Sequence, residues 1–211
     1  MASSRCAPTA SRLGPRENAA IALALLPVTC RRAGRRLDFA VVPARAEHVT
    51  AMTAIYAEQI EDGIGSFEDP IPDVAEITRR LAAVEALALP ALVALAPDGR
   101  VPGFCWARPF RPLGAYRGTV EDSIHVASDA RHHGVGRALL EALLAACARQ
   151  GLDEMIAVVG DARNRASIRL HQSVGFKPAG YLPRAGRKPD QTVDVVLLQR
   201  SLRPRVTQAT N

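Results

Sequence analysis

The sequence predicts a mixed α/β domain, and two observations carry that prediction. The chain has 211 residues, 48% hydrophobic and only 4% aromatic, so it can bury a sizeable core as a globular protein. Short apolar runs with the two-residue period of strands alternate with longer runs that have the 3.6-residue period of helices. The resulting order is β-α-α-β-β-β-α-β-α-β, without an internal repeat.

The first half of the chain is predicted to contain a strand, two helices and a hairpin, at residues 39–42, 47–60, 74–87, 92–96 and 103–107. Pro43 ends the strand, because proline cannot donate to a strand ladder. Each helix repeats apolar side chains on one face. The hairpin follows from Asp98-Gly99, a pair that favours tight turns between strands.

The second half is predicted to continue as strand, helix, strand, helix and strand, at residues 119–126, 135–149, 155–159, 164–174 and 193–198. The first of these helices has a regular apolar stripe, and Gly151 closes it. The strand that follows is apolar throughout, which is typical of a buried strand. Gly175 ends the second helix.

The net charge of +6 belongs to one end of the chain. Residues 1–36 contain seven Arg and one Glu, whereas residues 37–211 contain 20 basic and 20 acidic residues. The body of the protein is therefore balanced, and we expect no nucleic-acid partner. Arg outnumbers Lys by 25 to 2, a bias that a GC-rich genome explains better than phosphate binding.

Residues 1–36 are predicted to be a disordered or mis-started extension of a domain at 37–203, with a flexible tail at 204–211. The apolar run at 19–28 has the length of a signal-peptide core, but Cys30-Arg31-Arg32 follows it instead of a cleavage site. An organelle transit peptide and a downstream translation start are the alternatives. No run of 18 apolar residues is present, so no membrane span or membrane partner is expected.

The four cysteines, Cys6, Cys30, Cys105 and Cys147, form neither a C-x-x-C pair nor a metal-ligand spacing. We expect them to pack in a reducing compartment and to bind no metal. A cytoplasmic location is the corresponding prediction.

The segment at residues 131–136 has the pattern R-x-x-G-x-G and leads directly into a helix. Glycines allow the backbone to approach a phosphate closely, and a helix N-terminus presents free N–H groups with a positive dipole. The segment therefore suggests a pyrophosphate cradle, although an ordinary glycine turn before a helix has the same pattern.

Four patches together resemble the GCN5-related N-acetyltransferase (GNAT) superfamily. They are residues 119–123 with Val126, the turn at 131–136, Asn164 with residues 166–171, and residues 174–176. Residues 38–202 are most similar to its branch of phosphinothricin and methionine-sulfoximine N-acetyltransferases. The resemblance implies a mostly antiparallel central sheet flanked by helices, acetyl-CoA as donor, and transfer to the amine of a small molecule. It also implies a homodimer.

Glu121 stands where the family places its general base, a carboxylate that takes a proton from the attacking ammonium group. Strand alternation puts Ser123 and His125 on the same face as Glu121, and Asp122 on the other. His125 is thus a second candidate base or proton relay, at a position where relatives commonly have Tyr. His171 corresponds to a histidine implicated in catalysis in the branch, and it would orient a water on Glu121 or manage the proton of the leaving thiolate. A structural role is the alternative for each histidine.

The resemblance also assigns acetyl-CoA contacts. Main-chain groups of Ile124 and Val126 are expected to meet the pantetheine arm, and one N–H can stabilise the oxyanion. Asn164 is a good helix N-cap whose family counterpart touches the pantetheine, and Ser167 is expected to reach the same ligand. The expected pyrophosphate contacts are the N–H groups of Gly134, Val135, Gly136, Arg137 and Ala138, with charge from Arg131 and Arg137.

The acceptor side is less faithful to the branch. Phe67, Trp106, Arg111 and Tyr116 are predicted to line the acceptor pocket, with Trp106 equally suited to the core. Arg108 or Arg111 can bind a carboxylate through two hydrogen bonds. Leu113 occupies a position where close relatives carry Arg, so the exact amine is left open. A CoA-binding module without catalytic activity and a protein N-acetyltransferase are the competing hypotheses.

Overall fold

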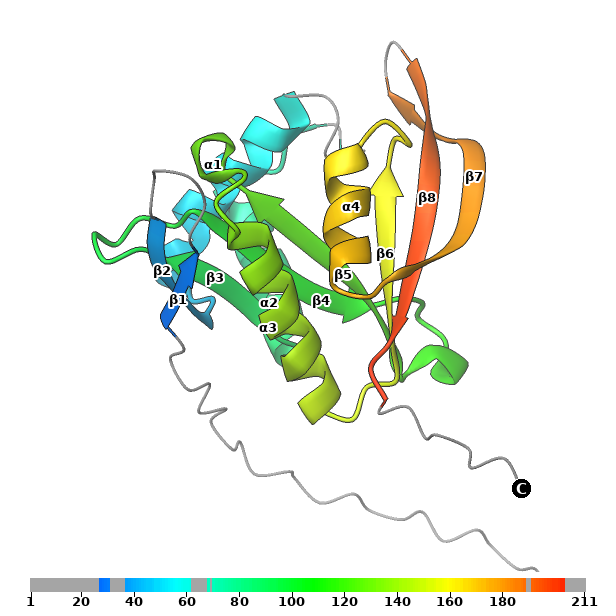
Figure 1. Ribbon diagram of the computed structural model, residues 1–211, viewed down its shortest axis with the longest axis horizontal. Coiled ribbons are helices and arrows are strands. Elements are labelled where there is room, and N and C mark those ends of the chain that lie inside the picture. The colour runs from blue at the N-terminus through cyan, green and yellow to red at the C-terminus, as the bar shows by residue number, and fades with distance from the viewer. Residues whose placement is uncertain (1–26, 31–36, 62–67, 69, 189–190, 204–211) are drawn as a thin grey trace, which may run out of the picture.

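A computed structural model describes residues 27–30, 37–61, 68, 70–188 and 191–203. These residues form an eight-stranded sheet in the order β1-β2-β3-β4-β5-β6-β8-β7. All neighbouring strands are antiparallel except β5 and β6, which run parallel. The predicted mixed, mostly antiparallel sheet flanked by helices is confirmed (Figure 1).

The strands are β1 (Pro27–Cys30), β2 (Leu37–Pro43), β3 (Ala91–Leu95), β4 (Gly103–Pro109), β5 (Thr119–Val126), β6 (Glu154–Gly160), β7 (Lys177–Lys188) and β8 (Gln191–Ser201). The α-helices are α1 (Val49–Glu61), α2 (Val74–Ala86), α3 (Val135–Arg149) and α4 (Arg165–Ser173). Short 3-10 turns occupy Ala46–His48, Gly114–Tyr116 and Ser128–Ala130. The predicted bounds of α3 and β5 agree with the structure at every residue.

Helices cover both faces of the sheet. Figure 1 shows α3 and α4 in front of it, with the cyan α1 and α2 behind. Residues of α3 such as Leu139 and Leu143 pack with Cys105 and Ala107 of β4 in one core cluster. The other cluster joins α1 and α2 to Phe104 and Trp106, which share one face of β4. Strand β4 is buried on both faces because it lies between these two cores.

The sheet splits between β5 and β6. Their parallel pairing runs from Thr119 opposite Glu154 to Asp122 opposite Ala157, and it ends there although both strands continue. The facing edges of β5 and β6 beyond these residues are therefore not joined by strand pairing. A split of this kind leaves main-chain groups available to a ligand in the middle of a sheet.

Two strands were not expected from the sequence. Among the described residues, strand β7 pairs only with β8, and irregular register occurs between Pro178 and Gly180 and between Leu182 and Gly186. Its prolines and glycines hide the strand pattern, and an edge strand tolerates them because one of its sides needs no ladder bonds.

Strand β1 lies within the segment that sequence analysis assigned to an extension, and it pairs antiparallel with β2. The strand adds four residues to the edge of the sheet at β2. The remainder of residues 1–36, and the tail at 204–211, lie outside the described residues.

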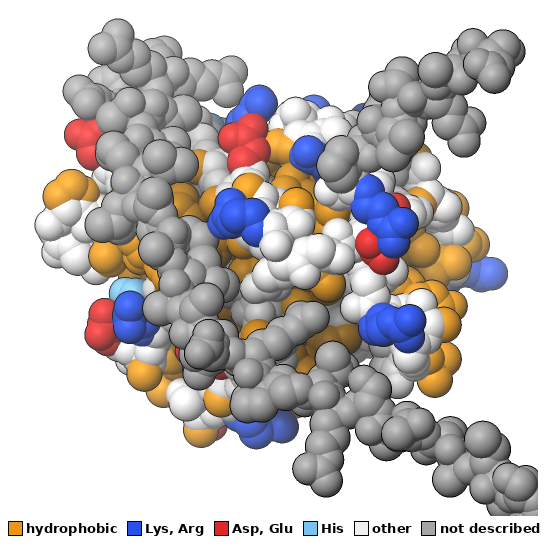
Figure 2. Space-filling view, turned by 90° about the horizontal axis from the view of Figure 1, so that it is seen from below, with side chains coloured by type: hydrophobic (Ala, Val, Ile, Leu, Met, Phe, Trp, Pro, Cys, Tyr) orange, Lys and Arg blue, Asp and Glu red, His pale blue; other side chains and the backbone are white. Residues whose placement is uncertain are grey.

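None of the described helices is long and apolar enough to cross a membrane. On the face of the molecule in Figure 2, Lys and Arg side chains are dispersed among acidic and apolar ones. This distribution agrees with the charge balance that the sequence predicts for residues 37–211.

Candidate active site

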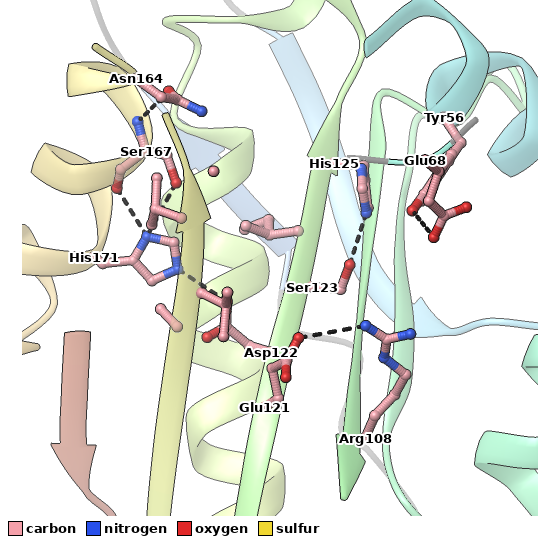
Figure 3. A pocket seen from close by; sticks show the side chains of 15 residues that line it. Tyr56, Glu68, Arg108, Glu121, Asp122, Ser123, His125, Asn164, Ser167 and His171 are labelled. Atoms are coloured by element: carbon pink, nitrogen blue, oxygen red, sulfur yellow. Dashed lines mark hydrogen bonds and ion pairs between the residues drawn. The ribbon is translucent and has the colours of Figure 1, made fainter. Parts of the chain in front are cut away.

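A pocket of about 180 Å³ opens at the split of the sheet. Strand β5 runs through its middle, with α4 and β6 on one side and α1 and β4 on the other (Figure 3). The lining residues with polar side chains are Tyr56, Glu68, Arg108, Glu121, Asp122, Ser123, His125, Asn164, Ser167 and His171. The pocket thus brings all three predicted catalytic residues, Glu121, His125 and His171, into one place.

The two faces of β5 present different chemistry. Glu121 contacts Arg108 of β4, His125 contacts Gln59 of α1 and Ser123 of its own strand, whereas Asp122 contacts α4. This is the alternation that the sequence predicts. It also separates the predicted catalytic residues, because Glu121 and His171 lie on opposite sides of β5 (Figure 3).

Glu121 is a partly buried carboxylate beside one cation. Its Oε1 lies 3.4 Å from Nη2 of Arg108, and its side chain is 25% exposed. Burial raises the pKa of Glu121, Arg108 opposes that shift, and the charge of Asp122 adds to it; the net direction is upward. A raised pKa makes this carboxylate a stronger base, while the remaining exposure lets a proton pass to solvent.

His125 is enclosed by α1 and β4. Its ring stacks on Phe104 with centroids 4.7 Å apart and lies 4.5 Å from the ring of Tyr56. Nε2 lies 2.8 Å from Oγ of Ser123, and Nδ1 lies 2.7 Å from Oε1 of Gln59. Burial, with smaller effects from nearby arginines, lowers the pKa of His125 to about 3. The imidazole is therefore neutral and a poor proton acceptor at neutral pH.

His171 forms a buried ion pair across the split. Its Nε2 lies 2.9 Å from Oδ2 of Asp122, and both side chains are almost fully enclosed. Its Nδ1 faces the carbonyl oxygen of Ser167 at 2.8 Å. Burial lowers the pKa of His171, but the Asp122 carboxylate outweighs it and the net shift is upward. Since both ring nitrogens face acceptors, the site favours the ring with a proton on each nitrogen and a positive charge.

Only one of the two carboxylate oxygens of Asp122 has a hydrogen-bond partner among the described residues. Its Oδ1 is buried and has no hydrogen-bond partner among the described residues, while Oδ2 holds His171. Buried carboxylate oxygens are rarely left unpaired, because desolvation then goes uncompensated. The atom is therefore available to a donor that enters the pocket.

The start of α4 places two further predicted residues at the pocket. The side chain of Asn164 accepts a hydrogen bond of 3.1 Å from the N–H of Ser167, so the predicted N-cap is confirmed. Oγ of Ser167 lies 3.4 Å from Nδ1 of His171. The cap thus fixes the first turn of α4 beside the ring that the helix carries into the pocket.

The glycine turn precedes α3 as predicted. Gly134 has φ of 80°, a left-handed conformation that favours glycine, and α3 begins at Val135 without a side-chain cap. The N–H of Ala138 already donates to Gly134 O at 3.0 Å, so the first helical bond consumes one of the expected phosphate contacts. The N–H groups of Val135, Gly136 and Arg137 precede that bond and keep the character of an anion site.

Gly136 is required for close packing, whereas Gly134 is required for its left-handed backbone conformation. A Cβ at Gly136 would lie 3.2 Å from a methyl of Leu170 and 3.4 Å from one of Val126. The residue therefore lets α3, α4 and β5 approach one another closely. Arg137 donates to Glu141 at 2.8 Å on the exposed side of α3, and Arg131 is the first residue of the turn at 131–136.

The main-chain groups of Ile124 and Val126 face the split. The N–H of Ala127 donates to Pro102 at 3.0 Å, and hydrogen-bonded pairs alternate along antiparallel strands. Ser123 and His125 therefore direct their backbone groups to β4, and Ile124 and Val126 direct theirs toward β6. Gln59 Nε2 donates to the carbonyl oxygen of Val126 at 3.2 Å.

The three predicted acceptor residues that the structure describes, Trp106, Arg111 and Tyr116, do not line this pocket. Trp106 is 1% exposed and packs against Phe104 in a core cluster, which favours the core role considered for it. Arg111 lies over the ring of Phe110, and Tyr116 packs edge-on to the same ring. Arg111 is near enough to lower the pKa of Glu121 slightly. Phe67 lies outside the described residues.

Sequence reasoning missed several residues of this site. Asp122 is the partner of His171, and Gln59 is the partner of His125. Tyr56 donates to Glu68 at 2.9 Å, and Glu68 also accepts from Arg80 at 2.8 Å. Residues far apart in the sequence make these contacts, so periodicity and motifs could not reveal them.

Comparison with known proteins defines the class of this protein. Residues 52–176 match the model of the acetyltransferase (GNAT) family. The chain belongs to this family of enzymes, as its split sheet and glycine turn indicate.

Its relatives specify the branch. The chain is 44% identical over 158 residues to a phosphinothricin N-acetyltransferase of Alcaligenes faecalis, covering 75% of the chain and 80% of the relative. It is 34% identical over 151 residues to an L-methionine sulfoximine/L-methionine sulfone acetyltransferase of Pseudomonas paraeruginosa, covering 72% and 87%. A crystal structure of a phosphinothricin acetyltransferase from Sinorhizobium meliloti with AcCoA matches with a TM-score of 0.74 and 34% identity, over 77% of this chain and 88% of that one. The predicted branch is confirmed.

Proposed function

We propose that this enzyme transfers an acetyl group from acetyl-CoA to the amine of a small amino-acid-like acceptor, of the phosphinothricin or methionine sulfoximine type. The observation that carries the proposal is Glu121, a carboxylate of raised pKa in a pocket at the split of the sheet. The two relatives described above are both named as acetyltransferases, and their names give phosphinothricin in one case and methionine sulfoximine or methionine sulfone in the other.

The residues present fit acetyl-CoA. Main-chain groups of Ile124 and Val126 face the split, where an extended pantetheine chain would lie between β5 and β6. The uncapped N-terminus of α3 would receive the pyrophosphate through the N–H groups of Val135, Gly136 and Arg137. When bound, acetyl-CoA supplies an activated thioester carbonyl, and no metal is invoked.

Glu121 would act as general base. An alkylammonium cannot attack until it loses a proton, and Glu121 would accept that proton directly or through water. Arg108 opposes the rise in the pKa of Glu121 that burial causes, and so favours the ionised form that a base requires. His125 is the weaker candidate for this role, since burial lowers the pKa of its ring to about 3 and makes it a weak base.

His171 would serve the leaving group. The ring carries a proton on each nitrogen and lines the same pocket on the side of α4. It can supply a proton to a thiolate, whereas it lacks the free lone pair that a base requires. Asp122 would stabilise the charged ring before that transfer.

Arg108 and Arg111 are the proposed carboxylate contacts of the acceptor, because guanidinium groups bind carboxylates through paired hydrogen bonds. Tyr116 and Phe67 are the proposed apolar contacts. We further propose that the enzyme acts as a homodimer, as its resemblance to the branch implies, and that it works in the cytoplasm, as the spacing of its cysteines suggests.

The test is thiol release from acetyl-CoA with a panel of amino acids that includes methionine sulfoximine, methionine sulfone and phosphinothricin. Turnover of at least one of these acceptors, well above hydrolysis, is expected. Tight binding of acetyl-CoA without turnover of any small amine would instead support the non-catalytic module. Acetylation confined to protein lysines or N-termini would support the protein-modifying alternative.

A further inference from the structure

Three side chains form a hydrogen-bonded chain on the acceptor side of β5. Ser123 Oγ lies 2.8 Å from Nε2 of His125, and Nδ1 of His125 lies 2.7 Å from Oε1 of Gln59. Gln59 projects from α1, and the other two project from β5 on the same face as Glu121. Figure 3 shows Ser123 between His125 and Glu121.

The direction of these hydrogen bonds follows from Gln59. Its amide nitrogen donates to the carbonyl oxygen of Val126 at 3.2 Å, so its amide oxygen must be the atom that faces His125. A flipped amide would set two oxygens against each other. Nδ1 of His125 therefore carries the proton, and Nε2 is left with a lone pair.

The tautomer of His125 in turn fixes the hydroxyl of Ser123. Nε2 can only accept, so the hydroxyl proton of Ser123 is donated to His125. The burial of the ring between Tyr56 and Phe104 prevents it from turning to another partner. The Ser123 oxygen makes no other hydrogen bond within the described residues, so its lone pairs remain for a donor in the pocket.

An ammonium group offers several N–H donors, and Glu121 can accept only some of them. Ser123 lies two residues along the strand from Glu121, so their Cα atoms are about 7 Å apart on one face. A donor group held between these two side chains would find an acceptor on each side. A hydroxyl free to rotate could instead point its proton at the ammonium and repel it.

On the basis of the proposed function, we infer that Ser123 binds the ammonium group of the acceptor amine as a hydrogen-bond acceptor. His125 and Gln59 are positioning residues, which hold the Ser123 proton away from the pocket. This assignment gives His125 a role that needs no change of its charge.

The experiment measures KM for the amine and for acetyl-CoA separately, using the best acceptor of the panel. Ser123→Ala is expected to raise KM for the amine about 10- to 100-fold, the usual effect of losing a hydrogen bond to a charged group, and to leave KM for acetyl-CoA within about twofold. Ser123→Thr keeps the hydroxyl and is expected to restore most of the affinity. Ser173→Ala, which removes an exposed hydroxyl that donates to Leu170, is the matched control.

A double-mutant cycle separates positioning from simple damage. His125→Phe keeps an aromatic ring against Tyr56 and Phe104 but frees the Ser123 proton, so KM for the amine is expected to rise several-fold. In the Ser123→Ala background the same change is expected to add almost nothing, since no proton is left to position. Additive effects would show that His125 only supports the fold.

The tautomer provides an independent readout. ¹⁵N NMR of the imidazole, assigned with His125→Phe, is expected to show Nδ1 protonated and Nε2 unprotonated. The opposite tautomer, or an unchanged KM for the amine in Ser123→Ala, would overturn the inference while leaving the proposed function intact. A wild-type chain that acetylates no amine would overturn both.

Discussion

Glu121 combines two properties that oppose each other. The carboxylate is desolvated enough to raise its pKa, yet it stays in reach of solvent and of Arg108. Desolvation strengthens it as a base and at the same time makes its ionised form costly in the folded state. Its substitution is therefore expected to change activity and stability in opposite directions.

Glu121→Gln is expected to lower kcat/KM by about 10²- to 10⁴-fold, the usual contribution of general base catalysis, with little change in acetyl-CoA affinity. The loss should shrink as pH rises toward the pKa of the amine, because free amine then forms without help. Steady-state kinetics from pH 6 to pH 10 and calorimetric titration of acetyl-CoA measure the two quantities. Glu85→Gln, at an exposed position of α2, is the control.

The same variant has an expected signature in stability. Because the folded pKa of Glu121 lies above its unfolded value of 4.5, the ionised carboxylate lowers the free energy of unfolding as pH rises through the folded pKa. Glu121→Gln should therefore melt at a higher temperature than wild type at pH 7, with the difference lost below pH 4. Near-full activity of this variant, combined with inactivity of His125→Ala, would move the base to His125.

The Asp122–His171 pair illustrates how burial makes a pair indispensable without making it strongly stabilising. Asp122→Ala leaves a buried positive charge without a partner and is expected to cost about 3–5 kcal/mol in urea unfolding. Asp122→Ala combined with His171→Ala should cost less than the two single changes together. Asp98→Ala in the exposed hairpin turn is the control.

The pH dependence of this pair has a definite sign. The folded pKa of His171 is raised above 6.5, so the pair's contribution to stability is complete below pH 6.5 and is lost as pH rises through the folded pKa. The difference in unfolding free energy between wild type and His171→Ala should therefore shrink in alkaline solution. A constant difference would mean that the ring is neutral in the folded protein.

At the scale of elements, removal of strand β1 tests where the domain begins. A chain that begins at Leu37 lacks β1 but keeps β2 as a new edge, three strands away from β5. We expect it to bind acetyl-CoA as the full chain does and to melt no more than a few degrees lower, measured by calorimetry and thermal unfolding. A large loss of affinity or of folding would show that residues 1–36 support the domain.

Elements with strong local patterns were predictable from the sequence, and the others were not. Helix α3 has a full apolar stripe between Gly134 and Gly151, and its predicted bounds are those of the structure. Strand β7 contains prolines and glycines, and it pairs with β8, so its existence depends on a partner that follows it in the chain.

The site divides in the same way. Glu121, His171 and the glycine turn follow from motifs, because motifs record residues that are close in sequence. The partners Asp122 and Gln59 follow from contacts with α4 and with β5 that span 49 and 66 positions. Trp106 lies in the core because β4 carries core side chains on both faces, which alternation alone does not reveal.

At the scale of the whole molecule, charge and architecture agree. The excess positive charge lies in residues 1–36, and the balanced domain places its polar side chains at the split between β5 and β6. The split lies near the centre of an eight-stranded sheet, between two core clusters. A ligand there is surrounded by elements that are held in place by packing instead of by loops.

The close contact of Gly136 with Leu170 and Val126 has a consequence for the thermodynamics of binding. It sets the spacing of α3, α4 and β5 when the chain folds, and α4 and β5 line the pocket at the gap. A ligand that enters a gap already held open does not have to supply the free energy of separating two strands. The cost of holding the strands apart is therefore part of the free energy of folding and is not subtracted from the free energy of ligand binding.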